Sequence, residues 1–173
     1  MNVRRVSRVV AIVAASIILA TAPRAAPRGE QGGVIPYPDG YRSWTHVKST
    51  IVGPEAAGFA ANGGLHHFYA NAGAIEGYRS GAFPDGAVLI DDLLELNATA
   101  PGASGEGARR RLAVMVKDSR RFTDTGGWGF EVFKADARDG SLSSDGRAAC
   151  YGCHRKADDG VFSNLPGVVD AGR

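Results

Sequence analysis

Cysteine and methionine are both scarce in this 173-residue sequence. The two cysteines, Cys150 and Cys153, are separated by only two residues. A disulfide between them would close a loop too short to constrain much of the unfolded chain, so a disulfide-stabilised scaffold is not indicated. Apart from the initiator Met1, the one methionine is Met115, and none follows the cysteines. The chain therefore offers few sulfur ligands, and its two thiols lie together near the C-terminus.

Acidic residues are absent from the first 26 positions, which carry Arg4, Arg5 and Arg8 ahead of an apolar run. A basic start, a short apolar stretch and small residues at its end are the parts of a secretory signal peptide. The apolar run is too short to cross a bilayer comfortably, which favours cleavage over a retained membrane anchor. We therefore predict a signal peptide over residues 1–26, a mobile lead-in over 27–35, and export to the periplasm.

The charge of the chain changes when this segment is removed. The full sequence has 20 Lys and Arg residues against 18 Asp and Glu residues, and four of the arginines lie within the first 26 positions. The mature chain then has 16 basic and 18 acidic side chains. The basic precursor is therefore no argument for a nucleic-acid partner. The remaining length corresponds to one domain, which we place at residues 36–173.

The two cysteines belong to the sequence Cys150-Tyr151-Gly152-Cys153-His154, the C-x-x-C-H pattern of covalent haem attachment. Each thiol can form a thioether with one haem vinyl group, and the adjacent His154 can bind the iron from the proximal side. A thioredoxin-like redox pair would lie near the start of a βαβ unit. A zinc site would need two further ligands from distant histidines. The pattern predicts one covalently attached haem c, held by Cys150, Cys153 and His154.

Turn signals divide the mature chain into short segments with strand character. The 24 glycines and the short apolar runs do not suit a four-helix bundle. Between strands we expect a helix capped by Asn71 and ended by Gly81, and a surface loop over residues 97–107. Because sequential strands joined by turns favour antiparallel pairing, the predicted fold class is α+β: an antiparallel β-sheet-rich single domain with a few short helices and the haem near the C-terminus. The expected strands are residues 44–51, 65–69, 87–96, 111–117 and 128–133.

The position of the haem motif restricts the sixth ligand of the iron. Small electron-transfer cytochromes c carry the motif near the N-terminus and supply a methionine from downstream, which this chain lacks. Met115 lies in an apolar segment, where core packing is its ordinary role. The other candidates are His46, His66 and His67, of which the adjacent His66 and His67 would point to opposite faces of a strand. The alternative is an open sixth position, which would allow a small ligand to bind.

Seven segments distributed along the mature chain carry a family resemblance. They are PDGYRSW at 38–44, LHHFYAN at 65–71, FPDGAV at 83–88, VKD at 116–118, TGGWGFE at 125–131, CYGCH at 150–154 and DGVFS at 159–163. Together these segments resemble the cytochrome P460 family, which also contains the cytochromes c′-beta. The resemblance implies an antiparallel β-rich fold, a five-coordinate haem with His154 as proximal ligand, and a homodimer. Some relatives oxidise hydroxylamine with a haem cross-linked to a mid-chain lysine, whereas c′-beta proteins lack the cross-link and bind nitric oxide or carbon monoxide in an apolar distal pocket.

The lysines of this chain depart from the pattern of the hydroxylamine-oxidising relatives. No lysine lies between Lys48 and Lys117, so the usual cross-link donor is missing. Either of these two lysines could replace it only if the fold brings the side chain to the porphyrin edge. Otherwise each is an ordinary solvated charge.

Glu131 favours an enzyme instead, because it follows Trp-Gly-Phe where the resemblance places distal-pocket residues. There a carboxylate could act as a general base towards a bound nitrogen compound. The alternative is that Glu131 faces solvent or pairs with an arginine. The predicted apolar walls of the distal pocket, each of which could instead belong to the core, are Phe68, Phe83, Phe130 and Phe133.

The sequence thus predicts a periplasmic c-type mono-haem protein with an open distal iron site that binds small nitrogen species such as nitric oxide. A hydroxylamine-oxidising enzyme is one alternative. The other is an electron-transfer cytochrome in which a protein side chain is the sixth ligand. We expect no nucleic-acid partner, and nothing in the sequence specifies the redox partner protein.

Overall fold

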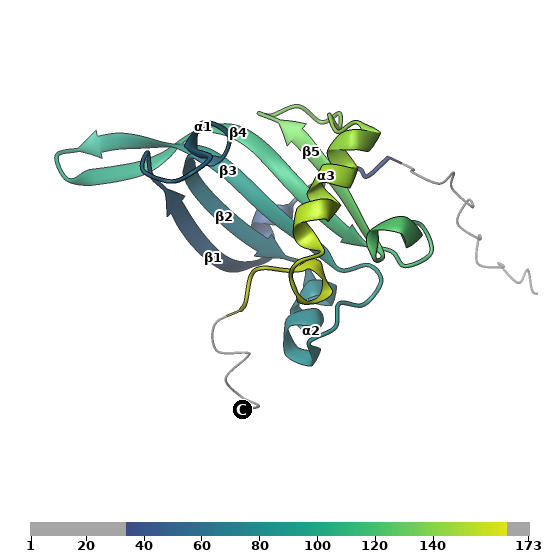
Figure 1. Ribbon diagram of the computed structural model, residues 1–173. Coiled ribbons are helices and arrows are strands. Elements are labelled where there is room, and N and C mark those ends of the chain that lie inside the picture. The colour runs from purple at the N-terminus through teal and green to yellow at the C-terminus, as the bar shows by residue number, and fades with distance from the viewer. Residues whose placement is uncertain (1–33, 166–173) are drawn as a thin grey trace, which may run out of the picture.

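The computed structural model describes residues 34–165, and a five-stranded antiparallel sheet forms their frame (Figure 1). The strand order is β1-β2-β3-β4-β5, so each strand pairs with its neighbour in sequence. This arrangement confirms the predicted α+β class. The strands are β1 (Thr45–Val52), β2 (Gly64–Ala70), β3 (Val88–Ala100), β4 (Ala103–Lys117) and β5 (Trp128–Lys134). The helices are α1 (Phe59–Asn62), α2 (Ala72–Ser80) and α3 (Ser144–His154), with 3₁₀ turns η1 (Tyr41–Ser43), η2 (Thr123–Thr125) and η3 (Asp158–Gly160).

Helix α2 begins and ends at the predicted residues. Asn71 Oδ1 accepts a hydrogen bond from the Ala74 N–H at 2.9 Å, which satisfies a free donor of the first turn. Gly81 follows the helix with φ +81°, and its N–H donates to the Gly77 carbonyl. A glycine in this left-handed conformation is a common helix end. Gly77 also lets Phe83 pack closely, because a Cβ there would lie 2.3 Å from its ring.

The predicted surface loop over residues 97–107 is instead the outer part of a long hairpin, which extends beyond the other strands in Figure 1. Strands β3 and β4 stay paired as far as Ala100 opposite Ala103. Pro101 and Gly102 form the turn, and Gly102 has φ +75°. The loop prediction was wrong because these small, mostly exposed residues are held by pairing with the facing strand, which composition does not reveal.

The two faces of the sheet bury different clusters. The first face packs against α2 and includes Trp128 and Phe130, and the second includes Phe133. Trp128 and Phe130 of β5 therefore point to one face of the sheet, and Phe133 points to the other. Ile35 belongs to the second cluster and is buried, so packing begins inside the predicted lead-in over residues 27–35. The predicted signal peptide, residues 1–26, lies outside the described residues.

Helix α3 lies over the first face of the sheet beside β5 (Figure 1). Its last turns carry the C-x-x-C-H sequence and so place it over this face of the sheet (Figure 1). Within residues 34–165, no helix has both the length and the apolar character needed to cross a membrane.

Candidate functional site

Helix α3 carries the C-x-x-C-H sequence in its last turns. At its start the Ser143 Oγ accepts a hydrogen bond from the Gly146 N–H at 3.1 Å, an ordinary N-cap. Cys150 and His154 are four residues apart, so they lie on the same side of the helix. Cys150 is half-buried and Cys153 is exposed, and both thiols are free. Burial raises the pKa of the Cys150 thiol.

His154 is oriented by a hydrogen bond from its Nδ1 to the Gly160 carbonyl, at 2.7 Å. A carbonyl only accepts, so Nδ1 carries a proton, and in the neutral ring the lone pair is then on Nε2. The ring centroid lies 5.3 Å from that of Phe130 and 5.4 Å from that of Phe162. A histidine ligand in a metal site is commonly held in this way, with one nitrogen fixed by a partner and the other available.

Asp159 holds the η3 segment that supplies the Gly160 carbonyl. One carboxylate oxygen accepts from Lys117 Nζ, and the other accepts from the Phe83 N–H at 2.8 Å. The Asp159 carbonyl accepts from Trp128 Nε1 at 2.7 Å. Asp159 has φ +41°, which is uncommon for a residue with a side chain. These three contacts hold it there and so fix the partner of the histidine.

A cavity of about 550 Å³ lies between this C-terminal region and the first face of the sheet. Its volume is in the ordinary range for ligand and cofactor sites. Cys150 and His154 line it from α3, and the segment at residues 161–163 completes that side. On the sheet side, one cross-strand row of lining residues runs through all five strands: Lys48, Phe68, Asp91, Ala113 and Val132.

The four phenylalanines predicted as distal walls lie in three different places. Phe68 and Phe130 line the cavity. Phe83 packs in the core of the first face, with its ring centroid 5.6 Å from that of Trp128. Phe133 is fully buried on the second face of the sheet. Neither Phe83 nor Phe133 lines the cavity. Phe83 packs against α2, and Phe133 points to the opposite face of the sheet because side chains alternate along β5.

Glu131 lies buried beneath the segment that leads into α3. Its Oε1 accepts from the backbone N–H groups of Val132 at 3.0 Å and Leu142 at 2.8 Å, and its Oε2 accepts from Arg147 at 2.8 Å. Burial opposes the charge, but these hydrogen bonds and the Arg147 cation hold the pKa of Glu131 below its ordinary value. These contacts correspond to the arginine-paired alternative. A role for Glu131 as distal base stays a prediction, and both its oxygens are engaged.

The candidate sixth ligands are also separated by the fold. Met115 lines the cavity, whereas none of the described histidines upstream of α3 does. His66 has both ring nitrogens in hydrogen bonds. His46 and His67 share the Ser49 hydroxyl, at 2.9 and 2.6 Å.

The two lysines weighed as cross-link donors have different surroundings. Lys48 lines the cavity, with Nζ 5.3 Å from the Phe68 ring centroid. Lys117 is paired with Asp159 and lies over the Trp128 ring, 4.9 Å from its centroid. Of these two, Lys48 is the one placed at the cavity.

Sequence reasoning missed two polar residues of the cavity wall, Asp91 and Arg111. Alternation along β3 could have found Asp91, because it shares a face with the apolar Leu89 and Leu93. Helix α3 was also missed, although Ser143 ahead of a short polar turn is a possible start signal.

The residues around the cavity fit a covalently attached haem. Cys150 and an oriented imidazole face a mainly apolar space, and Cys153 is one helical turn from Cys150. Within residues 34–165, no group of three or more His, Cys, Asp or Glu side chains is placed to hold a metal ion.

Comparison with known proteins gives one result that bears on identity. The family model described as Cytochrome P460 matches residues 38–163. The match includes all five strands, α3 and the C-x-x-C-H sequence. It agrees with the resemblance drawn from the sequence. A comparison with curated proteins finds no match.

Proposed function

Because the chain belongs to the cytochrome P460 family and is a haem-binding cytochrome, we propose that it binds small nitrogen species such as nitric oxide at an open distal iron site. The observation that supports this proposal is the cavity shared by His154, Phe68, Met115 and Phe130. In it, the His154 imidazole faces a sheet wall to which His46, His66 and His67 do not contribute.

The residues of the cavity divide into two groups by their roles in this proposal. Cys150 and Cys153 would hold one haem c through thioethers, and His154 would be the proximal ligand. The haem supplies the iron to which the small ligand binds. On the sheet side, Phe68 contributes an apolar surface that excludes water, and Phe130 packs beside the His154 ring.

An absorption and resonance Raman experiment on the holoprotein tests this proposal. We expect a five-coordinate resting haem whose ferrous spectrum changes on addition of nitric oxide. Met115→Leu is the matched control, because Met115 is the candidate protein ligand in the cavity wall. A six-coordinate low-spin resting spectrum that becomes five-coordinate in Met115→Leu would support the electron-transfer alternative instead.

Hydroxylamine oxidation is the second candidate function, and the position of Lys48 in the cavity wall favours it. In this version Lys48 would form the cross-link to the porphyrin. Intact mass and tryptic peptide mapping decide between the two. A haem found only on the peptide that contains Cys150 and Cys153 would exclude the cross-link, and Lys48→Met provides the comparison spectrum.

We also propose export to the periplasm and assembly as a homodimer. Covalent haem attachment of this type in bacteria takes place outside the cytoplasmic membrane, and the family resemblance implies the dimer. Cell fractionation with N-terminal sequencing tests the first, and sedimentation equilibrium of the holoprotein tests the second.

A further inference from the structure

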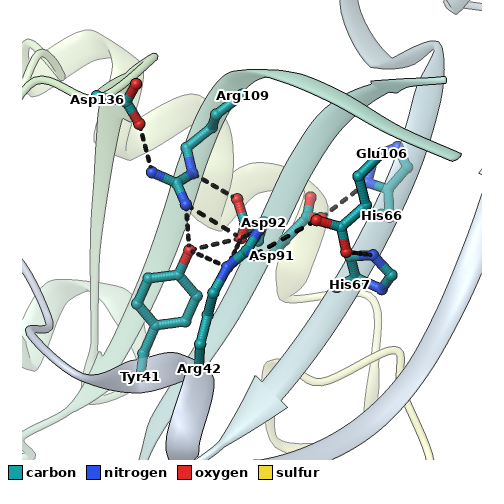
Figure 2. Close-up of polar contacts among 9 residues, drawn as sticks. All are labelled: Tyr41, Arg42, His66, His67, Asp91, Asp92, Glu106, Arg109 and Asp136. Atoms are coloured by element: carbon teal, nitrogen blue, oxygen red, sulfur yellow. Dashed lines mark hydrogen bonds and ion pairs between the residues drawn. The ribbon is translucent and has the colours of Figure 1, made fainter. Parts of the chain in front are cut away.

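Asp91 lies at the centre of the sheet side of the cavity. It is on β3, the middle strand, opposite Phe68 of β2 and Ala113 of β4. The adjacent Asp92 lies on the second face, where it is fully buried. Figure 2 shows it joined to Tyr41, Arg42 and Arg109, and the Arg109 bond is 2.7 Å. The charge of Asp92 is therefore balanced by arginines in the core, whereas Asp91 faces the cavity.

His66 holds one oxygen of Asp91. Its Nδ1 lies 2.8 Å from Asp91 Oδ1, and its Nε2 lies 2.8 Å from the Asn62 carbonyl. Both partners accept hydrogen bonds, so only a doubly protonated ring satisfies both. Consistent with this, the hydrogen bond to Asp91 raises the pKa of His66 despite burial. Asp91 Oδ1 is thus fixed in orientation by a charge-assisted hydrogen bond from a buried histidine.

The other oxygen of Asp91 keeps its capacity to accept. The Arg111 guanidinium lies 3.6 Å from Asp91 Oδ2, which is an ion-pair distance and not a hydrogen bond. The Arg111 guanidinium donates instead to the Ala61 carbonyl at 2.8 Å and to Asn62 Oδ1 at 3.0 Å. Within the described residues Asp91 Oδ2 accepts no hydrogen bond, and its side chain is 21% exposed. An oriented carboxylate oxygen is therefore available in the cavity wall.

We propose that Asp91 determines which ligands the cavity prefers, by accepting a hydrogen bond from a small nitrogen compound that carries an N–H or O–H group. Hydroxylamine belongs to this class, whereas nitric oxide and carbon monoxide have no hydrogen to donate. Glu131, the other carboxylate near the cavity, has both oxygens engaged. Met115 and the phenylalanines offer no comparable acceptor. The inference rests on the proposed ligand-binding function and adds its specificity-determining residue.

Spectroscopic titration of the holoprotein tests this role in Asp91→Leu and Asp91→Asn. We expect Asp91→Leu to weaken hydroxylamine binding to the ferric protein by about tenfold or more, since a hydrogen bond to a charged group is lost. Carbon monoxide binding to the ferrous protein should change by less than about threefold, because no hydrogen bond to the ligand is lost. Asp91→Asn keeps an acceptor oxygen and should fall between wild type and Asp91→Leu. Glu76→Gln, on the exposed surface of α2, is the control for loss of a carboxylate and should match wild type.

The two ligands separate failure of this inference from failure of the proposed function. Equal weakening of both ligands in Asp91→Leu, or unchanged hydroxylamine binding, would overturn the role of Asp91 while leaving the open iron site intact. If the wild-type protein binds neither ligand, the proposed function fails and the inference fails with it. A wild-type absorption spectrum in Asp91→Asn, which retains a polar partner for His66, shows that the cavity is still formed.

Discussion

At the scale of single residues, Asp159 is the side chain on which the orientation of His154 depends. We expect Asp159→Ala to lower the free energy of unfolding by about 1–3 kcal/mol, because the Phe83 N–H loses its acceptor and Lys117 loses its carboxylate partner. Its effect should also reach the haem, since Gly160 would no longer be fixed. The iron–histidine stretching band in the ferrous Raman spectrum should then broaden or shift.

The neighbouring Asp158 is the matched control for this prediction, because its side chain is exposed. Asp158→Ala should leave both the unfolding free energy and the Raman band close to wild type. A band unchanged in Asp159→Ala, despite a loss of stability, would show that η3 supports the fold but not the orientation of the histidine.

Site residues could be predicted from the sequence where the C-x-x-C-H pattern specifies covalent haem attachment. Cys150, Cys153 and His154 are defined by their spacing, and the structure places Cys150 and His154 at one cavity. The phenylalanines could not be assigned in the same way. Phe68 and Phe133 have the same chemistry, but their places depend on which face of the sheet each strand presents, and that follows from pairing between distant segments.

At the scale of elements, an N-cap and an ion pair contribute to holding α3 on the sheet. No residue of α3 is fully buried, although Cys150 and Tyr151 pack partly buried against the apolar cluster. We expect Ser143→Ala to cost about 1 kcal/mol of unfolding free energy, because the Gly146 N–H loses its acceptor. Urea unfolding of the holoprotein measures this cost.

Ser143→Asp separates capping from other effects of the substitution. Aspartate is as good an N-cap as serine and carries a charge that the helix N-terminus favours. Ser143→Asp should therefore retain wild-type stability. If it loses as much as Ser143→Ala, the contribution of the Ser143 hydroxyl is not that of a cap.

The extent to which each element buries apolar side chains explains which elements could be predicted from the sequence. Helix α2 buries Ile75 and Tyr78 and has a capping asparagine and a terminal glycine, so both periodicity and caps point to it. Helix α3 has no buried apolar stripe to give a period. The hairpin beyond Leu96 was missed for a related reason, because its residues are held by backbone pairing while their side chains stay mostly exposed.

At the scale of the whole molecule, buried ionisable groups on both faces of the sheet make stability depend on pH in opposite directions. Burial opposes ionisation of Asp92 and Glu131, but their arginine partners and hydrogen bonds hold both pKa values below the ordinary ones. Their stabilisation is complete above the ordinary values, 3.8 and 4.5, and is lost as the pH falls through the lower folded values. The pKa of His66 is raised above 6.5 by Asp91, so its stabilisation is complete below 6.5 and is lost as the pH rises through the folded value.

The unfolding free energy of the holoprotein should therefore be greatest between about pH 4.5 and 6.5 as far as these three groups determine it. Urea unfolding at a series of pH values measures the curve. Glu131→Gln should lower stability at pH 6 and reduce the decline on the acid side, while the decline due to Asp92 persists. His66→Gln should lower stability at pH 6 and remove its part of the decline above 6.5, without changing the acid side. An alkaline slope that is identical in wild type and His66→Gln would show that His66 is not held as a cation, and the orientation of Asp91 would then need another cause.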